Sequence, residues 1–228
     1  TEMASKATRK KYDLKTKFRT IPGALGNYDI MGKKYSVAEL EEIIVGTNTL
    51  SEKDYLECRV MNLFVTTFYN NSLFYEIYSM LRSIGASCFD CLIYMIEHTE
   101  LYSDKVKKIL AKFITETTED LFDSQEKANK YVLSPEIINK YIGGDLGNNE
   151  LYLNRARLVN EFEDICNLMF KSVEGSLKEK NLYTQEIKNY LFELKQFILM
   201  RKKDFIISTE SIKSAMFRYD FEAIQKAK

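Results

Sequence analysis

The cysteines and the single histidine are the residues best suited to bind a metal ion. Cys88 and Cys91 are three residues apart, and His98 follows seven residues later. On a helix this spacing places both thiols on one face, and thiolates with an imidazole suit zinc. A structural zinc site needs four ligands, however, and Cys58 and Cys166 offer no second close pair. Small buried side chains are the simpler interpretation of these cysteines, and we expect no metal in this chain.

A glycine-rich stretch could bring its backbone close to a phosphate. Residues 142–149 read IGGDLGNN, and the loop Gly143–Gly147 contains three glycines. The stretch follows a predicted helix rather than a strand, and it lacks the lysine of a phosphate-binding loop. We therefore favour a loop that ends a helix, and the role of this loop stays open.

The sequence predicts no catalytic residue. With one histidine, a nucleophile–histidine–acid arrangement would require His98, which lies near a predicted helix C-terminus where an imidazole can interact with the helix dipole. The acidic run at residues 116–120, ETTED, is more typical of a solvated helix face than of a catalytic site. Four aromatic residues could form a stacking surface, although aromatic core is the favoured interpretation: Tyr69, Phe74, Tyr75 and Tyr78.

Composition and charge limit the class of partner. The chain has 228 residues, of which 45% are hydrophobic, so it has enough apolar material for a core. Its 33 basic and 33 acidic side chains balance, so net charge argues against nucleic acid or an anionic membrane as the main partner. Residues 1–20 differ, since seven basic against two acidic side chains give +5, which is typical of a solvated or partner-facing segment. No apolar run reaches the roughly 20 residues of a membrane span. Four cysteines without the dense spacing of a disulfide framework favour a reducing compartment, so we expect a cytoplasmic location.

From Ser51 onward, apolar residues recur with the helical period. Helices are expected to begin at Ser51 with Asp54, at Ser103, and at Ser134 before Pro135. The serine hydroxyls at these positions can accept hydrogen bonds from free backbone N–H groups. Gly85 and the pair at 143–144 are expected to end helices. The pattern predicts a mainly α fold, a bundle of six or more helices with at most about a tenth of strand. Helices are expected around residues 51–69, 74–84, 87–97, 103–122, 135–142, 158–169 and 187–198.

The first 50 residues have a different pattern, which predicts an extended or β-type segment. Short β-type runs at 18–21, 28–31 and 43–45 are separated by Pro22-Gly23, Gly26-Asn27 and Gly32. Ser36 with Glu39 could instead be a capping box that opens a short helix. Short strands are not stable alone, so they must pack on the helices or on a sheet elsewhere. The predicted division is therefore residues 1–50 and residues 51–228.

Residues 1–70 resemble a stretch of cobalamin-binding radical SAM proteins, where the radical SAM barrel ends and a helical C-terminal domain begins. The matching pieces are Met3-Ala4, Arg9-Lys10-Lys11-Tyr12, Glu41-Glu42-Ile43-Ile44-Val45, Thr47-Asn48-Thr49-Leu50 and Ser51-x-x-Asp54-Tyr55. The later helices match only in general character. The chain lacks CxxxCxxC, whose cysteines bind the iron–sulfur cluster of that family, and it has no segment like a cobalamin-binding domain.

The resemblance implies that this chain is the C-terminal accessory part of a longer enzyme, with Thr1 preceded by an upstream radical SAM barrel. That parent would be a methyltransferase or a related transferase with an unknown substrate. Its iron–sulfur cluster, S-adenosylmethionine and cobalamin would all bind outside this chain. Five residues would face the barrel or the substrate: Met3, Arg9, Lys10, Lys11 and Tyr12.

The alternative is a stand-alone helical module for protein–protein interaction. Under the family interpretation, residues 1–35 are expected to be the least stable part of the isolated chain, because their backbone groups would pair with a barrel that is absent. Self-association of the isolated chain is then possible through the same segment.

Overall fold

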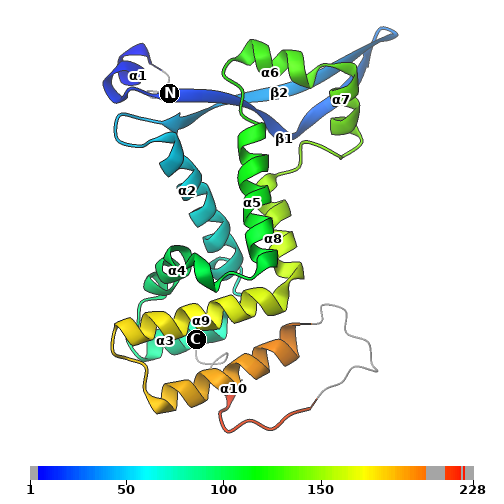
Figure 1. The fold of residues 1–228 in the computed structure, drawn as a ribbon. Helices are drawn as coiled ribbons and strands as arrows, with labels where there is room; N and C mark the ends of the chain where they lie inside the picture. Colours follow the sequence, from blue (N-terminus) through cyan, green and yellow to red (C-terminus); the bar gives the residue numbers. More distant parts are fainter. Residues whose placement is uncertain (1–4, 204–213, 222, 224–228) are drawn as a thin grey trace. The chain divides into compact units, whose positions relative to one another are not determined.

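A computed structural model describes residues 5–203, 214–221 and 223, and its fold is mainly α with an extended N-terminal segment, as predicted (Figure 1). The chain forms two compact units. The hairpin unit contains residues 5–60 and 110–154, and the helical unit contains residues 61–109 with the described residues after 154. Each unit is therefore built from two separate stretches of sequence. The division into 1–50 and 51–228 groups the residues differently and stays a prediction.

The hairpin unit begins with α1 (Lys6–Tyr12), β1 (Lys15–Ile30) and β2 (Lys33–Gly46) and includes α6 (Gln125–Val132) and α7 (Pro135–Ile142). Three helices run from one unit into the other along the chain: α2 (Glu52–Phe64), α5 (Asp104–Glu119) and α8 (Glu150–Asn160). The helical unit adds a π-helix (Val65–Tyr69), α3 (Tyr75–Ser83), α4 (Cys88–Glu97), a 3-10 turn (Thr99–Leu101), α9 (Phe162–Glu179) and α10 (Gln185–Lys202).

The expected short strands are one long antiparallel hairpin. Its two-residue turn is Met31-Gly32, and both residues have positive φ, as a type I′ turn requires. Asp29 Oδ1 accepts from Gly32 N–H at 3.0 Å and supports this turn. The stretch Pro22-Gly23 does not end the strand, because it lies where the register shifts between Thr20 and Leu25 and proline needs no ladder partner.

The alternative of a short helix opening at Ser36 is wrong, since residues 33–46 are strand. Ser36 lies opposite Asn27 in the ladder, and its hydroxyl donates to Asn27 Oδ1 at 2.7 Å. A cross-strand hydrogen bond therefore replaces the expected helix cap.

Helices of the same unit support the hairpin. Ala38 and Leu40 of β2 pack against a buried cluster of Val132, Ile138 and Tyr141 from α6 and α7. Phe18 and Phe122 exchange two backbone hydrogen bonds of 2.8 Å. The extended segment thus satisfies its backbone within the hairpin and packs on helices of the chain. How stable residues 1–35 are stays a prediction.

The core of the helical unit is aromatic. Phe64, Phe68 and Phe74 stack in series, with ring centroids 5.5 and 5.8 Å apart, and Phe162 continues the series at 6.1 Å. Each of these side chains is almost fully buried. Lys202 at the end of α10 donates to Glu76 Oε2 and to the Leu73 carbonyl, both at 2.7 Å, and joins α10 to α3.

Most predicted helix ends are confirmed. Ser51 and Asp54 cap each other, with Asp54 N–H donating to Ser51 Oγ at 3.2 Å. Gly85 has φ +70° beyond α3. Ser134 differs, because its hydroxyl donates to the Tyr131 carbonyl instead of capping α7. The single helix expected across residues 158–169 is two helices, α8 and α9, separated at Glu161.

Within the described residues, no single helix has the length and apolar character to cross a membrane. The pair α3 and α4 meets that test only when taken together, and it is bent by 118°.

Candidate functional site: the tip face of the hairpin

The outer half of the hairpin has one mostly apolar face that no described helix covers. Lys33 also lies on this face, with its ammonium 5.2 Å from the Tyr35 ring centroid. Tyr28 lies opposite Tyr35, and the alternation along each strand places Ile30 and Val37 on the same side. Tyr28 and Ile30 are each 56% exposed, and Tyr35 and Val37 are each 42% exposed. We call these four side chains the tip face. In Figure 1 the hairpin extends past α6 and α7 to its turn.

The opposite face of the same stretch is polar. It carries Asn27, Asp29, Lys34 and Ser36, all of them exposed. Farther along β2, this polar side becomes the side that packs on α6 and α7 through Ala38 and Leu40. The apolar residues of the tip therefore point away from the core of their own unit. An apolar patch that is held in a regular strand and left uncovered is typical of a protein-binding surface.

The predicted partner-facing residues lie at the other end of the hairpin, and they are not all free. Arg9 forms two hydrogen bonds with Glu42 of β2, at 2.7 and 2.5 Å. These bonds lower the pKa of Glu42 to about 2. Lys10 and Lys11 are exposed, and the Lys11 ammonium lies 4.9 Å from the Tyr12 ring centroid. Met3 lies outside the described residues.

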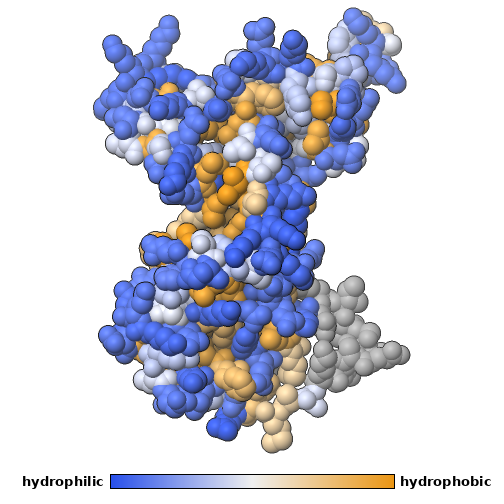
Figure 2. All heavy atoms as spheres, in the orientation of Figure 1, coloured by the Kyte–Doolittle hydropathy of each residue, from blue (hydrophilic) through white to orange (hydrophobic). Residues whose placement is uncertain are grey.

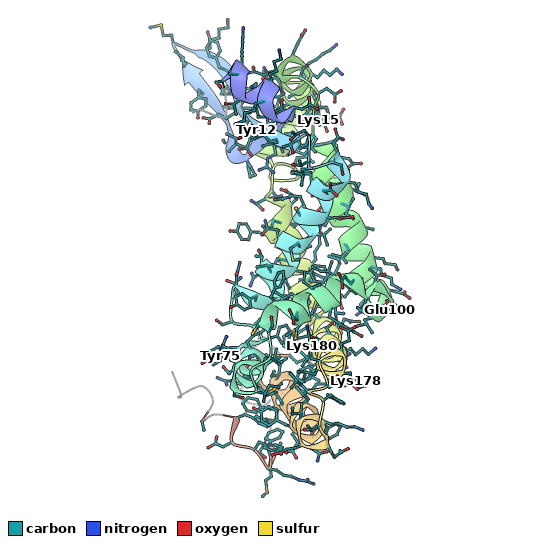
Figure 3. All side chains as sticks on the ribbon, turned by 90° about the vertical axis from the view of Figure 1, so that its left-hand side faces the viewer. Tyr12, Lys15, Tyr75, Glu100, Lys178 and Lys180 are labelled. Carbon is teal, nitrogen blue, oxygen red and sulfur yellow. The ribbon has the colours of Figure 1, made fainter. Side chains whose placement is uncertain are left out.

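Arg9 thus holds α1 on the hairpin, while Lys10, Lys11 and Tyr12 remain on the surface. Figure 3 shows Tyr12 and Lys15 together at the α1 end of the hairpin. The structure therefore separates a small basic surface near α1 from the apolar tip face.

A small acidic recess of about 170 Å³ lies in the hairpin unit and includes Asp120, which was expected to be solvated. Burial raises the pKa of Asp120 to about 6, and the Thr20 hydroxyl donates to both of its carboxylate oxygens at 3.2 and 3.3 Å. Glu150 in the same recess forms ion pairs with Arg59 and, at 3.5 Å, with Arg19. Five of the eleven lining residues are carboxylates: Glu116, Glu119, Asp120, Asp145 and Glu150.

This recess is too small for an ordinary ligand pocket of roughly 300 Å³ or more. The loop at 143–147 ends α7, with Gly144 and Gly147 at positive φ, and Asp145 to Gly147 line the recess. Acidic surroundings repel phosphate, so the loop is favoured as a helix-ending turn. Sequence patterns missed the burial of Asp120 because its hydroxyl partner is 100 residues away.

Burial disfavours the thiolate form of both cysteines of the metal pattern. Burial raises the pKa of Cys91 to about 11 and also raises that of Cys88. The Cys88 thiol donates to the Tyr78 carbonyl at 3.9 Å. His98 instead stacks on Tyr94, with ring centroids 3.7 Å apart.

Across the described parts of the chain, no three His, Cys, Asp or Glu side chains form a group that could hold a metal ion. The expectation that the chain binds no metal remains a prediction for elemental analysis.

Comparisons with protein-family models, with curated proteins and with solved structures gave no match to this chain.

Proposed function

We propose that this chain is the C-terminal accessory part of a cobalamin-dependent radical SAM enzyme of the methyltransferase type. In this proposal the upstream barrel of the same polypeptide carries out the chemistry, and the tip face docks against it. The iron–sulfur cluster, S-adenosylmethionine and cobalamin bind to the upstream part, and the compartment is the cytoplasm. The residues of this chain position the catalytic part and its unknown substrate and do not take part in the reaction.

The observation that carries the proposal is the uncovered apolar tip face. Tyr28, Ile30 and Tyr35 stand exposed on a strand pair that is ordered by its turn and ladder. Removing apolar surface from water is favourable by roughly 25 cal/mol per Å², so a complementary surface would bind there. The sequence of the same hairpin supplies Glu41 to Val45, one of the pieces that resemble the end of a radical SAM barrel. The segment that carries the resemblance therefore also carries the exposed surface.

The test compares amide hydrogen exchange in this chain and in the full-length protein. We expect residues 26–37 to exchange several-fold more slowly in the longer protein, because docking excludes water from the tip face. The amides of α9, far along the sequence from the hairpin, serve as the internal control. Ile30→Ser should remove the added protection, whereas Lys34→Ser, on the polar face of the same strand pair, should retain it.

The second candidate is a stand-alone interaction module, and the tip face also supports it. The full open reading frame separates the two candidates. A CxxxCxxC motif upstream of Thr1 would support the assignment to a radical SAM enzyme. Absence of the motif would overturn that assignment. If the motif is present but residues 26–37 exchange equally in both proteins, the enzyme assignment stands and the docking role of the tip face is wrong.

A further inference from the structure

The helical unit contains a second feature, a cavity of about 770 Å³. It lies between the end of α3, the beginning of α10 and the segment 214–221. Its volume falls within the range of roughly 300 to 1,000 Å³ that is usual for small-molecule sites. Segment 214–221 follows α10 in Figure 1, and Figure 2 shows its pale orange atoms at the lower edge of the view. The walls of the cavity thus come from three separate stretches of the chain.

Aromatic and aliphatic side chains form most of the walls. Tyr190 of α10 and Tyr219 of the C-terminal segment meet edge to face, with centroids 4.9 Å apart and planes at 70°. Tyr75 lies at the start of α3 (Figure 3). Aromatic walls of this kind suit a flat aromatic body. The apolar lining residues are Tyr75, Met80, Ile84, Ile187, Tyr190 and Tyr219.

The charged groups of the lining limit the charge of a guest. Arg82 and Glu186 both line the cavity. The Arg82 guanidinium lies 6.0 Å from the Tyr75 ring centroid and donates to Ser79 Oγ at 3.4 Å. Among the described residues it has no carboxylate partner within ion-pair distance, so it can pair with an anion from outside. Glu186 offsets this charge, and a polyanion such as a nucleotide would be repelled.

We propose that this cavity binds a small aromatic monoanion, with its ring system among the tyrosines and its acidic group on Arg82. Apolar contact supplies most of the affinity, and the guanidinium selects for the charge. Tyr190 remains a neutral phenol, because burial raises its pKa to about 12, and so it adds no negative charge to the wall.

The experiment uses two probes that share one ring system. Isothermal titration of the whole chain with 8-anilinonaphthalene-1-sulfonate is compared with N-phenyl-1-naphthylamine, which lacks the sulfonate. We expect one site per chain and severalfold tighter binding of the sulfonate, because Arg82 is exposed and water screens its ion pair with the probe. Arg82→Gln should remove this preference, and Arg82→Lys should keep part of it.

Two matched variants locate the site. Ile187→Trp fills the cavity and should abolish binding of both probes, whereas Phe192→Trp, at a 67% exposed position on the same helix, should not. Ile30→Ser on the tip face should leave the titration unchanged. Circular dichroism confirms that each variant is folded. Absence of saturable binding, or binding that survives Ile187→Trp, would overturn the proposal, as would an equal effect of Arg82→Gln on both probes.

Discussion

Two buried tyrosines of the helical unit differ in one hydrogen bond. The Tyr102 hydroxyl donates to the Met95 carbonyl at 2.9 Å, whereas the Tyr78 hydroxyl is buried and has no hydrogen-bond partner in the described structure. A buried polar group without a partner costs free energy, while a satisfied one contributes about 1 kcal/mol. The same phenol therefore stabilises the fold at one position and destabilises it at the other.

We expect Tyr102→Phe to lower the free energy of unfolding by about 1 kcal/mol and Tyr78→Phe to leave it unchanged or raise it. Both substitutions keep the ring and its packing. Urea denaturation of the two variants under identical conditions measures the difference. A larger loss for Tyr78→Phe than for Tyr102→Phe would show that the Tyr78 hydroxyl has a partner after all.

Asp120 gives the hairpin unit a predictable pH dependence. Its folded-state pKa of about 6 lies above the ordinary value of an aspartate, mainly because of burial. The folded protein therefore holds this proton more tightly than the unfolded chain does. The Asp120 contribution to the free energy of unfolding is fully present below the ordinary aspartate pKa of 3.8 and is lost as pH rises through about 6.

We expect Asp120→Asn to raise the free energy of unfolding by about 2 kcal/mol at pH 7 and to have little effect near pH 4. Denaturation curves between pH 4 and pH 7.5 measure this. Thr20→Val serves as the companion variant, because removing the hydroxyl that stabilises the carboxylate should shift the pH dependence upward. A variant that is equally stabilised at every pH would contradict the assignment.

Helix ends show how far sequence predicts the elements. The Ser51 and Asp54 cap is local, since both partners lie within one turn, and the pattern alone identifies it. The sequence pattern predicts short strands instead of one long hairpin, because Pro22 and Gly23 usually end a strand. Here they occupy a register shift that depends on the facing strand. No proline or glycine marks the break between α8 and α9 at Glu161, so periodicity alone predicts a single helix there.

The glycine at position 175 of α9 is explained by a side chain of the neighbouring helix α4. It lies inside α9, where glycine is unfavourable by about 1 kcal/mol relative to alanine. A Cβ atom at this position would overlap the Tyr94 ring of α4. The close approach of α4 and α9 therefore requires the absence of a side chain.

Gly175→Ala should lower the free energy of unfolding by about 1 to 3 kcal/mol, despite the better helix propensity of alanine. In a Tyr94→Ala background the same change should be neutral or stabilising, because the overlapping ring is gone. A double-mutant cycle by thermal or urea denaturation measures the coupling. Equal effects of Gly175→Ala in both backgrounds would contradict this account.

At the scale of the whole molecule, the fold class could be predicted and the candidate sites could not. Helical periodicity after Ser51 is repeated in every segment, so the mainly α fold follows from the sequence. The tip face depends on which side of β2 meets α6 and α7, a contact between residues about 100 positions apart. The recess around Asp120 and the cavity beside Tyr190 depend on similar distant pairs. Local patterns carry no information about such pairs.

The whole chain should purify without a stoichiometric metal. Raised thiol pKa values disfavour the thiolates that zinc requires at Cys88 and Cys91. Elemental analysis of the untagged protein, with a buffer blank as control, is expected to find far less than one zinc or iron per chain. One equivalent of either metal would contradict this prediction.

The discontinuity of both units has a consequence for synthesis on the ribosome. Residues 5–60 are synthesised well before the residues they pack with, so the hairpin lacks α6 and α7 until residue 142 has been made. The helical unit cannot be completed until its two long helices α9 and α10 have been synthesised. Neither unit can finish folding before its second stretch has been synthesised, and the side of β2 that carries Ala38 and Leu40 is exposed until then. Stable folding of the hairpin unit is therefore expected only after α8 has been synthesised, and that of the helical unit only after α10.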